Sequence, residues 1–161
     1  MNADSRGLKH QELTDKIIGV FYEVYNELGH GFLEAVYEQA MTIALSEAGL
    51  RVDRQFPLKV TFRGQVIGDY RADLIVEGAI ILELKAGSGI DPAHEAQLLH
   101  YLRATEIEVG LLLNFGPKPQ FKRLVFENSK KQIRVNPRLV PHEVGLLLGF
   151  GSTLEFKRFC L

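Results

Sequence analysis

Cysteine is almost absent from this chain of 161 residues: the only one is Cys160, next to the C-terminal Leu161. A single cysteine excludes an intrachain disulfide and a zinc site built from cysteines. No apolar run approaches the roughly 18 residues that are needed to span a membrane. Residues 1–16 are polar and lack the apolar stretch of a signal peptide. We therefore expect a cytoplasmic protein that has no membrane segment.

The composition, 46% hydrophobic and 24% charged, is ordinary for a globular protein, and the length fits a single domain, 1–161. The net charge of −1 hides an uneven distribution. Residues 1–116 have a balance of −7, whereas residues 117–161 have a balance of +6. The C-terminal part is therefore a candidate surface for a polyanion. The alternative is a solvated basic edge that discourages strand aggregation.

Hydrophobic periodicity predicts a mixed α/β fold in which helices pack against one sheet. A helix over about residues 12–28 is followed by a second at about 32–48. Three strands come next, and then a helix that Asp91 and Pro92 begin as N-cap and first residue. Two more strands complete the pattern. The predicted strands are residues 51–62, 65–76, 79–87, 108–116 and 121–128, and the third helix ends at about residue 104.

A segment of the C-terminal part repeats an earlier one. "VGLLLNFGPKPQFKR" at 109–123 recurs as "VGLLLGFGSTLEFKR" at 144–158, with ten of fifteen positions identical. Two copies are too few for a solenoid, so the repeat indicates a local duplication of a strand pair. The second copy is expected to extend the sheet edge or to pair with a second subunit, which would make a homodimer, unless it stays loose.

Two acids interrupt apolar strands, where ionised groups are costly unless they are paired or ligated. Asp73 and Glu83 lie ten residues apart in consecutive predicted strands. A turn with an odd number of residues, such as Glu77-Gly78-Ala79, places them opposite each other, with Cβ atoms about 4.5 to 5.5 Å apart. A two-residue turn at 77–78 would put them on opposite faces.

Lys85 follows Glu83 by two positions, so both side chains project to the same face of their strand. Two carboxylates beside a lysine suit Mg²⁺ or Mn²⁺, and the lysine can orient an attacking water or balance charge on a phosphate. The alternative is an ordinary salt bridge from either acid to Lys85 or Arg71.

Two helices carry further candidates. Gln97 and Tyr101 are i, i+4 neighbours and could hold a water or a phosphate oxygen, unless they are only the polar rim of an amphipathic helix. Glu34 lies at the start of a buried face in the second helix. Its alternative role is to stabilise that helix through the dipole. We expect Glu34, Asp73, Glu83, Lys85 and Gln97 to converge on one concave site.

These residues resemble a known pattern. Asp73 followed by Glu83-x-Lys85 is similar to the motif of the PD-(D/E)XK nuclease superfamily, and Gln97 and Tyr101 match the Q-x-x-x-Y motif of its RecB-like branch. More narrowly, "GFLEAVY" resembles the motif of the GxxExxY family. Gly31, Glu34 and Tyr37 are the three residues of that motif. The resemblance covers about residues 14–128. The C-terminal extension 129–161, which contains the copy at 144–158, lies beyond it.

The resemblance implies a restriction-endonuclease-like core: a mixed four-stranded sheet flanked by helices. It also implies a Mg²⁺-dependent nuclease that hydrolyses phosphodiester bonds of nucleic acid, DNA rather than RNA. Asp73, Glu83 and the carbonyl of Leu84 would bind metal, with Glu34 in or beside that site. Lys85 would assist the water, and Gln97 and Tyr101 would position water or phosphate. The acidic balance of residues 1–116 suits an alternative, a binding or regulatory module that keeps the fold without turnover.

Overall fold

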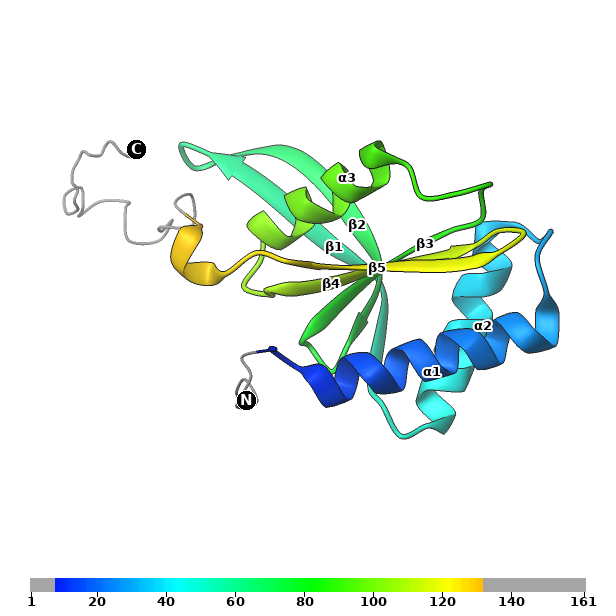
Figure 1. Cartoon of the computed structure of the whole chain (residues 1–161). Coiled ribbons are helices and arrows are strands. Elements are labelled where there is room, and N and C mark those ends of the chain that lie inside the picture. Colours follow the sequence, from blue (N-terminus) through cyan, green and yellow to red (C-terminus); the bar gives the residue numbers. More distant parts are fainter. Residues whose placement is uncertain (1–7, 132–161) are drawn as a thin grey trace.

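The computed structural model of the chain describes residues 8–131 (Figure 1). The predicted second strand pair at 144–158, and with it the expected subunit contact, lies outside these residues. Within 8–131, no helix is long and apolar enough to cross a membrane. The elements are α1 (Gln11–Leu28), α2 (Glu34–Glu47), β1 (Val52–Phe62), β2 (Gln65–Val76), β3 (Ile80–Lys85), α3 (Pro92–Arg103), β4 (Val109–Phe115), β5 (Pro119–Val125) and the short 3-10 helix η1 (Asn128–Lys130).

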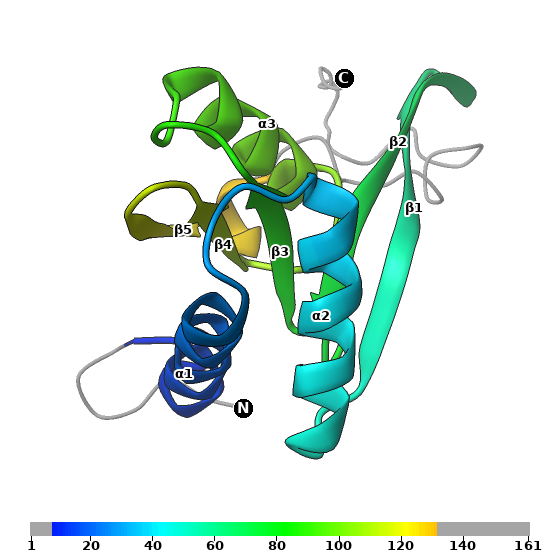
Figure 2. The same cartoon turned by 90° about the vertical axis from the view of Figure 1, so that its right-hand side faces the viewer.

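The strands form one sheet in the order β1-β2-β3-β4-β5. Only β3 and β4 are parallel, and α3 is the crossover that a parallel pair requires. Helices α1 and α2 lie on one face of the sheet and α3 on the other (Figures 1 and 2). The predicted α/β class, a mixed sheet flanked by helices, is therefore confirmed. The five described strands correspond to the five that the sequence predicted, whereas the core that the resemblance implied has one strand fewer.

The core is divided by the sheet into two clusters. On the side of α1 and α2, the ring of Phe115 packs between Phe21 and Tyr37, with ring centroids 4.9 and 4.2 Å away. Ile80, Leu82 and Leu84 of β3 belong to this cluster, whereas Ile81 belongs to the cluster under α3. Side chains alternate along a strand, so Glu83 and Lys85 share the α3 side with Ile81.

Helix α3 begins where the sequence predicted it. Asp91 is the N-cap, and its carboxylate accepts a hydrogen bond of 2.8 Å from the N–H of Ala93. His94 completes a capping box, since its Nδ1 accepts from the N–H of Asp91. The helix packs closely on β4 because Gly110 has no side chain: a Cβ there would lie 2.8 Å from Cδ1 of Leu98. This close packing fixes the height of α3 above the sheet.

The loop that follows Lys85 is held against the end of β4. The buried side chain of Asn114 donates to the carbonyl of Gly87 and accepts from its N–H, at 3.1 and 3.0 Å. Gly116 lies so close to this loop that a Cβ on it would be 2.1 Å from the carbonyl oxygen of Gly87. The segment directly after Lys85 therefore has a defined position.

Gly116→Ala is expected to lower the free energy of unfolding by about 1 to 3 kcal/mol, the usual range for overpacking. The added methyl group must displace the backbone at Gly87, and the Asn114 hydrogen bonds with it. Denaturant unfolding measures the loss. Gly19→Ala is the matched control, since Gly19 is exposed in α1 with open space around a Cβ, and alanine there should stabilise by about 0.5 to 1 kcal/mol. Equal stability of the Gly116 variant and the wild type would contradict the prediction.

Candidate active site between the sheet and helix α3

The turn between β2 and β3 has the parity that brings the two acids together. Val76 pairs with Ile80, which leaves the three residues 77–79 as the turn. The last described pair in the other direction is Leu74 with Leu82, so Asp73 and Glu83 are the next opposing positions. The structure therefore has the three-residue turn, one of the two alternatives that the sequence left open. The two-residue turn, which would have separated the acids, is not the one observed.

Asp73 lies at a local break in the strand. Ala72 and Ile75, three positions apart, both face the cluster under α3, so strict alternation is interrupted between them. Across the β1–β2 ladder, the paired residues skip Gln55, whose φ of 49° is unusual for a residue other than glycine. The break separates Asp73 from regular pairing and frees its carboxylate to turn toward β3.

The carboxylates of Asp73 and Glu83 each approach the backbone of the opposite strand. Oδ2 of Asp73 accepts a hydrogen bond of 2.8 Å from the N–H of Leu84. Oε2 of Glu83 lies 3.4 Å from the backbone nitrogen of Asp73. The two acids are therefore interlocked at the point where β2 leaves β3.

Three polar side chains continue from the acids toward α3. Nζ of Lys85 lies 3.5 Å from Oε1 of Gln97, and Nε2 of Gln97 donates to the hydroxyl of Tyr101 at 2.9 Å. Gln97 and Tyr101 are one helical turn apart on the face of α3 that meets the sheet. The structure thus brings together five of the six side chains that the sequence singled out: Asp73, Glu83, Lys85, Gln97 and Tyr101.

Burial and mutual repulsion make the acids resist ionisation. The side chain of Glu83 is buried, and desolvation, followed by the charge of Asp73, raises its pKa to about 8. Desolvation also raises the pKa of Asp73, although the N–H of Leu84 opposes the shift. Among residues 8–131 neither acid forms an ion pair, with Lys85 or with Arg71, whose guanidinium instead donates to the carbonyl of Gln55. The salt-bridge interpretation is therefore wrong for the described residues.

This donor set fits a divalent cation. The two carboxylates have raised pKa values and lack a cationic partner. A hard cation bound between them would stabilise their ionised forms. Asp73 and Glu83 are the acids that could hold it. No group of three or more histidine, cysteine or acidic side chains in the described part of the chain is arranged to ligate a metal. Further ligands would therefore be backbone carbonyls, water or substrate oxygens.

Helix α2 places two acids near Asp73, and only one was predicted. Glu34 is exposed in the first turn and raises the pKa of Asp73 slightly. Glu38, one turn later, has a larger effect on that pKa and is buried. Its carboxylate accepts from Nε2 of Gln55 at 2.9 Å and pairs with Arg54 at 3.5 Å.

The sequence did contain a signal for Glu38: it precedes the buried Met41 by three positions and Leu45 by seven, along one helical stripe. Tyr37, by contrast, has a structural role. Its hydroxyl donates to the carbonyl of Gly29 at 2.6 Å and accepts from the N–H of Phe32. The buried tyrosine thus holds the turn before α2 against the core. It thereby helps to position the first turns of α2, which carry Glu34 and Glu38.

Comparisons with known proteins bear on what these residues do. A family model described as the PD-(D/E)XK nuclease superfamily matches residues 11–124, which include the five clustered side chains. No curated protein matches the chain. The solved structure titled "Crystal structure of SSO0001" is 19% identical, with a TM-score of 0.49 over 58% of this chain. The chain spans 50% of that structure's length.

The family match covers α1 through β4 and most of β5, that is, both layers of helices and the sheet between them. The five-stranded mixed sheet with its three helices is a restriction-endonuclease-like α/β fold. The narrower resemblance to the GxxExxY family stays a prediction. With most of its length matched by the model, the chain belongs to the PD-(D/E)XK nuclease superfamily.

Proposed function

We propose that this chain is a divalent-metal-dependent nuclease that hydrolyses phosphodiester bonds of nucleic acid. One observation carries the proposal: two interlocked acids, with raised pKa values and no described ion-pair partner, share a face with Lys85 and Gln97 inside the region that the nuclease family model matches. Purely structural acids would have been paired or replaced by apolar residues without loss. Keeping such a pair in a core suits chemistry better than stability.

In this proposal Asp73, Glu83 and the carbonyl of Leu84 hold Mg²⁺ or Mn²⁺. When bound, the cation supplies charge that stabilises the developing negative charge on the phosphate. Because a cation favours the ionised carboxylates, binding requires Glu83 to release its proton. The charges of Glu38 and Glu34 are among the causes that raise the pKa of Asp73, so these acids add negative charge near that end of the site.

The position of Lys85 supports a role in orienting the attacking water. Its Nζ is oriented by Gln97, and no described carboxylate within ion-pair distance neutralises it. It would orient the attacking water and then balance the charge that develops on the phosphate as the phosphorus–oxygen bond breaks. Gln97 donates to Tyr101, so the amide and the hydroxyl form one rigid unit that would position water or a phosphate oxygen.

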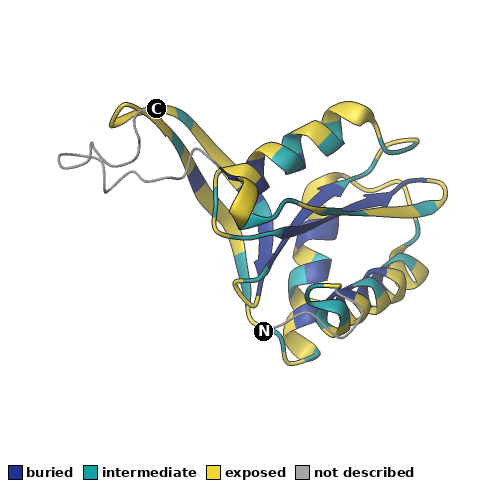
Figure 3. Ribbon diagram, turned by 60° about the vertical axis from the view of Figure 1, so that its left-hand side comes forward, coloured by how far each residue is buried: buried dark blue, intermediate teal, exposed yellow. Residues whose placement is uncertain are grey.

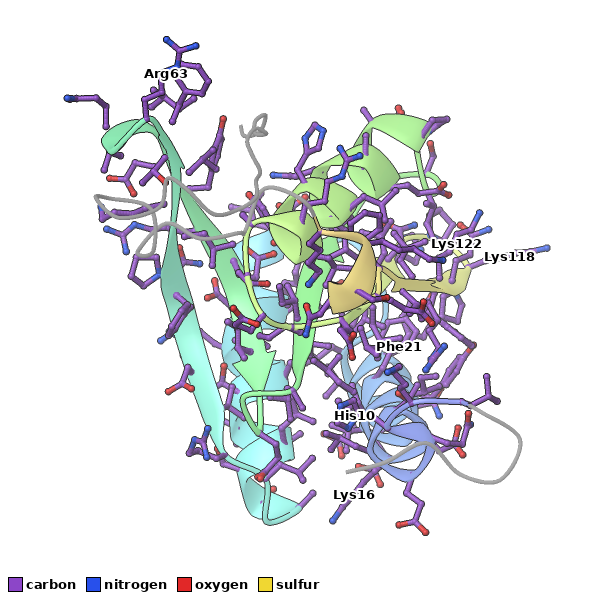
Figure 4. All side chains as sticks on the ribbon, turned by 90° about the vertical axis from the view of Figure 1, so that its left-hand side faces the viewer. His10, Lys16, Phe21, Arg63, Lys118 and Lys122 are labelled. Atoms are coloured by element: carbon purple, nitrogen blue, oxygen red, sulfur yellow. The ribbon has the colours of Figure 1, made fainter. Side chains whose placement is uncertain are left out.

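A cleavage assay tests this function. Full-length protein is incubated with labelled single- and double-stranded DNA and RNA, with Mg²⁺, with Mn²⁺ and with chelator. We expect cleavage with metal only, and a loss of at least about 100-fold in Lys85→Ala, the usual effect of removing one group that stabilises transition-state charge. Lys16→Ala is the matched control, since Lys16 is an exposed lysine of α1 on the opposite side of the sheet (Figure 4).

Two results would contradict the proposal. Cleavage that persists in chelator, or a Lys85→Ala variant as active as the wild type, would exclude the proposed chemistry. Absence of cleavage under every metal condition, together with binding of nucleic acid, would favour the regulatory module that keeps the fold without turnover.

A further inference from the structure

A groove adjoins the candidate active site. It has a volume of about 790 Å³ and lies between α3 and the outer half of the β1–β2 hairpin. The hairpin projects beyond the body of the molecule, and its outer half is largely exposed (Figure 3). Arg63 marks its tip (Figure 4). The volume is in the range of small-molecule sites, roughly 300 to 1,000 Å³. The residues used below are Leu58, Val60, Tyr70, Ala96, Gln97 and Tyr101.

The groove and the candidate site share two residues. Gln97 and Tyr101 line the groove, and the same Gln97 contacts Lys85. Burial, followed by the charge of Glu83 and more weakly that of Asp73, raises the pKa of the Tyr101 hydroxyl, in keeping with its contact to Gln97 beside Lys85. A strand whose phosphate is held at the acids would therefore have an adjoining nucleotide at the mouth of the groove.

The walls of the groove suit an aromatic ring rather than a phosphate backbone. Leu58 and Val60 of β1 form one side, and the exposed Ala96 of α3 lies across from them. Tyr70 is half exposed, and its ring centroid lies 6.1 Å from that of Tyr101, with the planes tilted by 48°. Aromatic faces beside apolar walls are how proteins bind unpaired bases, at about 1 to 3 kcal/mol per stacked base.

The position of Tyr70 is made possible by a neighbour on the same strand. A Cβ on Gly68 would lie 2.7 Å from Cε2 of Tyr70, so the ring extends over the glycine. A side chain at position 68 would push the ring away from its present place along the groove.

The rim carries two cationic side chains that suit phosphates. Lys59 and Arg103 line the groove, with Glu106 as the acid among the lining residues. Lys59 is paired with Asp69 at 3.4 Å, and the guanidinium of Arg103 lies over the ring of Phe126 at 5.2 Å. Cations around an apolar floor are the combination found where proteins track a single strand.

From this juxtaposition we infer that the groove binds an unpaired nucleotide of a nucleic-acid strand, with its base against Tyr70, next to the bond that is cut. The inference rests on the proposed nuclease function and adds the substrate class: a single strand of DNA or RNA, or a duplex with an unpaired segment at the cleavage site.

Fluorescence anisotropy in chelator tests the inference without cleavage. The probes are a short labelled DNA strand, its blunt duplex and the RNA strand of the same sequence. Wild-type full-length protein should bind both single strands more tightly than the duplex. Tyr70→Ala should weaken binding of the DNA strand about tenfold and change binding of the duplex less than about twofold. Tyr70→Phe, which keeps the ring, should bind like the wild type.

Phe62→Ala is the matched control, because Phe62 is another exposed aromatic of the hairpin that does not line the groove. It should leave binding unchanged. Thermal melts should show that Tyr70→Ala is folded, as expected for a half-exposed side chain. Undiminished affinity of Tyr70→Ala for the strand, or a duplex bound as tightly as the single strands, would overturn the inference.

The two proposals fail in different ways. Loss of strand binding in Tyr70→Ala, from a protein that cleaves nothing with Mg²⁺ or Mn²⁺, would refute the nuclease function and leave the groove assignment in place. A Tyr70→Ala variant that cleaves with metal and binds with the affinity and strand preference of the wild type would refute the groove assignment. It would leave the nuclease function in place.

Discussion

Replacing Asp73 with asparagine is expected to reduce metal-dependent cleavage to background while leaving the metal-free protein as stable as the wild type or more stable. Asparagine keeps an oxygen that can accept the hydrogen bond from Leu84, so the strand geometry is preserved. It removes one of the two charges proposed to hold the cation. The loss should exceed the roughly 100-fold that removal of a supporting contact costs a metal site.

The gain in stability should depend on pH. Two carboxylates about 5 Å apart repel by about 3 kcal/mol at an effective dielectric constant near 20. Glu83 of the wild type retains its proton up to about pH 8, which relieves most of this repulsion at neutral pH. Asp73→Asn should therefore match the wild type near pH 7 and exceed its stability above pH 8, where both acids of the wild type are ionised.

Thermal melts with chelator and with a Mg²⁺ or Mn²⁺ series measure both effects. The melting temperature of the wild type should rise with metal concentration, because the ligand binds the native state. The variant should lose that dependence. Asp53→Asn, which removes a partly exposed acid of β1 paired with Arg51, is the control and should keep it. A wild type insensitive to metal, together with a destabilised Asp73→Asn variant, would remove the nuclease proposal.

The sequence predicted the parts of the site that depend on local spacing. The i, i+4 relation of Gln97 and Tyr101 and the i, i+2 relation of Glu83 and Lys85 follow from helix and strand geometry alone. The sequence allowed either a three-residue turn at 77–79 or a two-residue turn at 77–78. Spacing alone could not decide between them. The observed register, in which Val76 lies opposite Ile80, resolves the choice.

What the sequence could not predict depends on contacts between distant elements. Glu38 is buried because Gln55 and Arg54, 17 and 16 positions later, reach its carboxylate, and that contact depends on the break in β1. The helical stripe of Met41 and Leu45 indicates a buried position for Glu38, but it does not indicate which residues satisfy the carboxylate. The groove is likewise formed by two elements, the β1–β2 hairpin and α3, whose relative placement no periodicity encodes.

The second large effect concerns pH: the metal-free protein should become less stable as the pH rises from about 5 to 8, and Glu83→Gln should remove most of this loss. The native state holds the Glu83 proton up to about pH 8, whereas the unfolded chain releases it near its ordinary pKa of 4.5. The native state thus binds more protons in this range, so its free energy of unfolding falls with pH. The difference is on the order of 3 to 5 kcal/mol, because each pKa unit corresponds to about 1.4 kcal/mol.

Metal binding should have the opposite dependence on pH. A cation between the acids must displace the Glu83 proton, so its affinity should rise up to about tenfold per pH unit below pH 8 and then level off. Calorimetric titration of Mn²⁺ at several pH values measures this rise. Cleavage limited by metal binding should increase over the same range.

Glu108→Gln is a control of opposite sign. Hydrogen bonds from Asn128 and the nearby Lys9 lower the pKa of Glu108, so this acid stabilises the protein above its ordinary pKa and loses that effect as the pH falls. Glu108→Gln should therefore lower stability at neutral pH and leave the decline between pH 5 and 8 intact. Burial lowers the pKa of His10, so the unfolded chain binds this proton more readily and the free energy of unfolding rises with pH. This contribution is the same in every variant and cancels in the comparison.

Denaturant unfolding at pH 5, 6, 7 and 8 measures the stability of the wild type and of Glu83→Gln. Parallel curves for the two proteins would show that Glu83 ionises normally, and the site would lose its electrostatic basis.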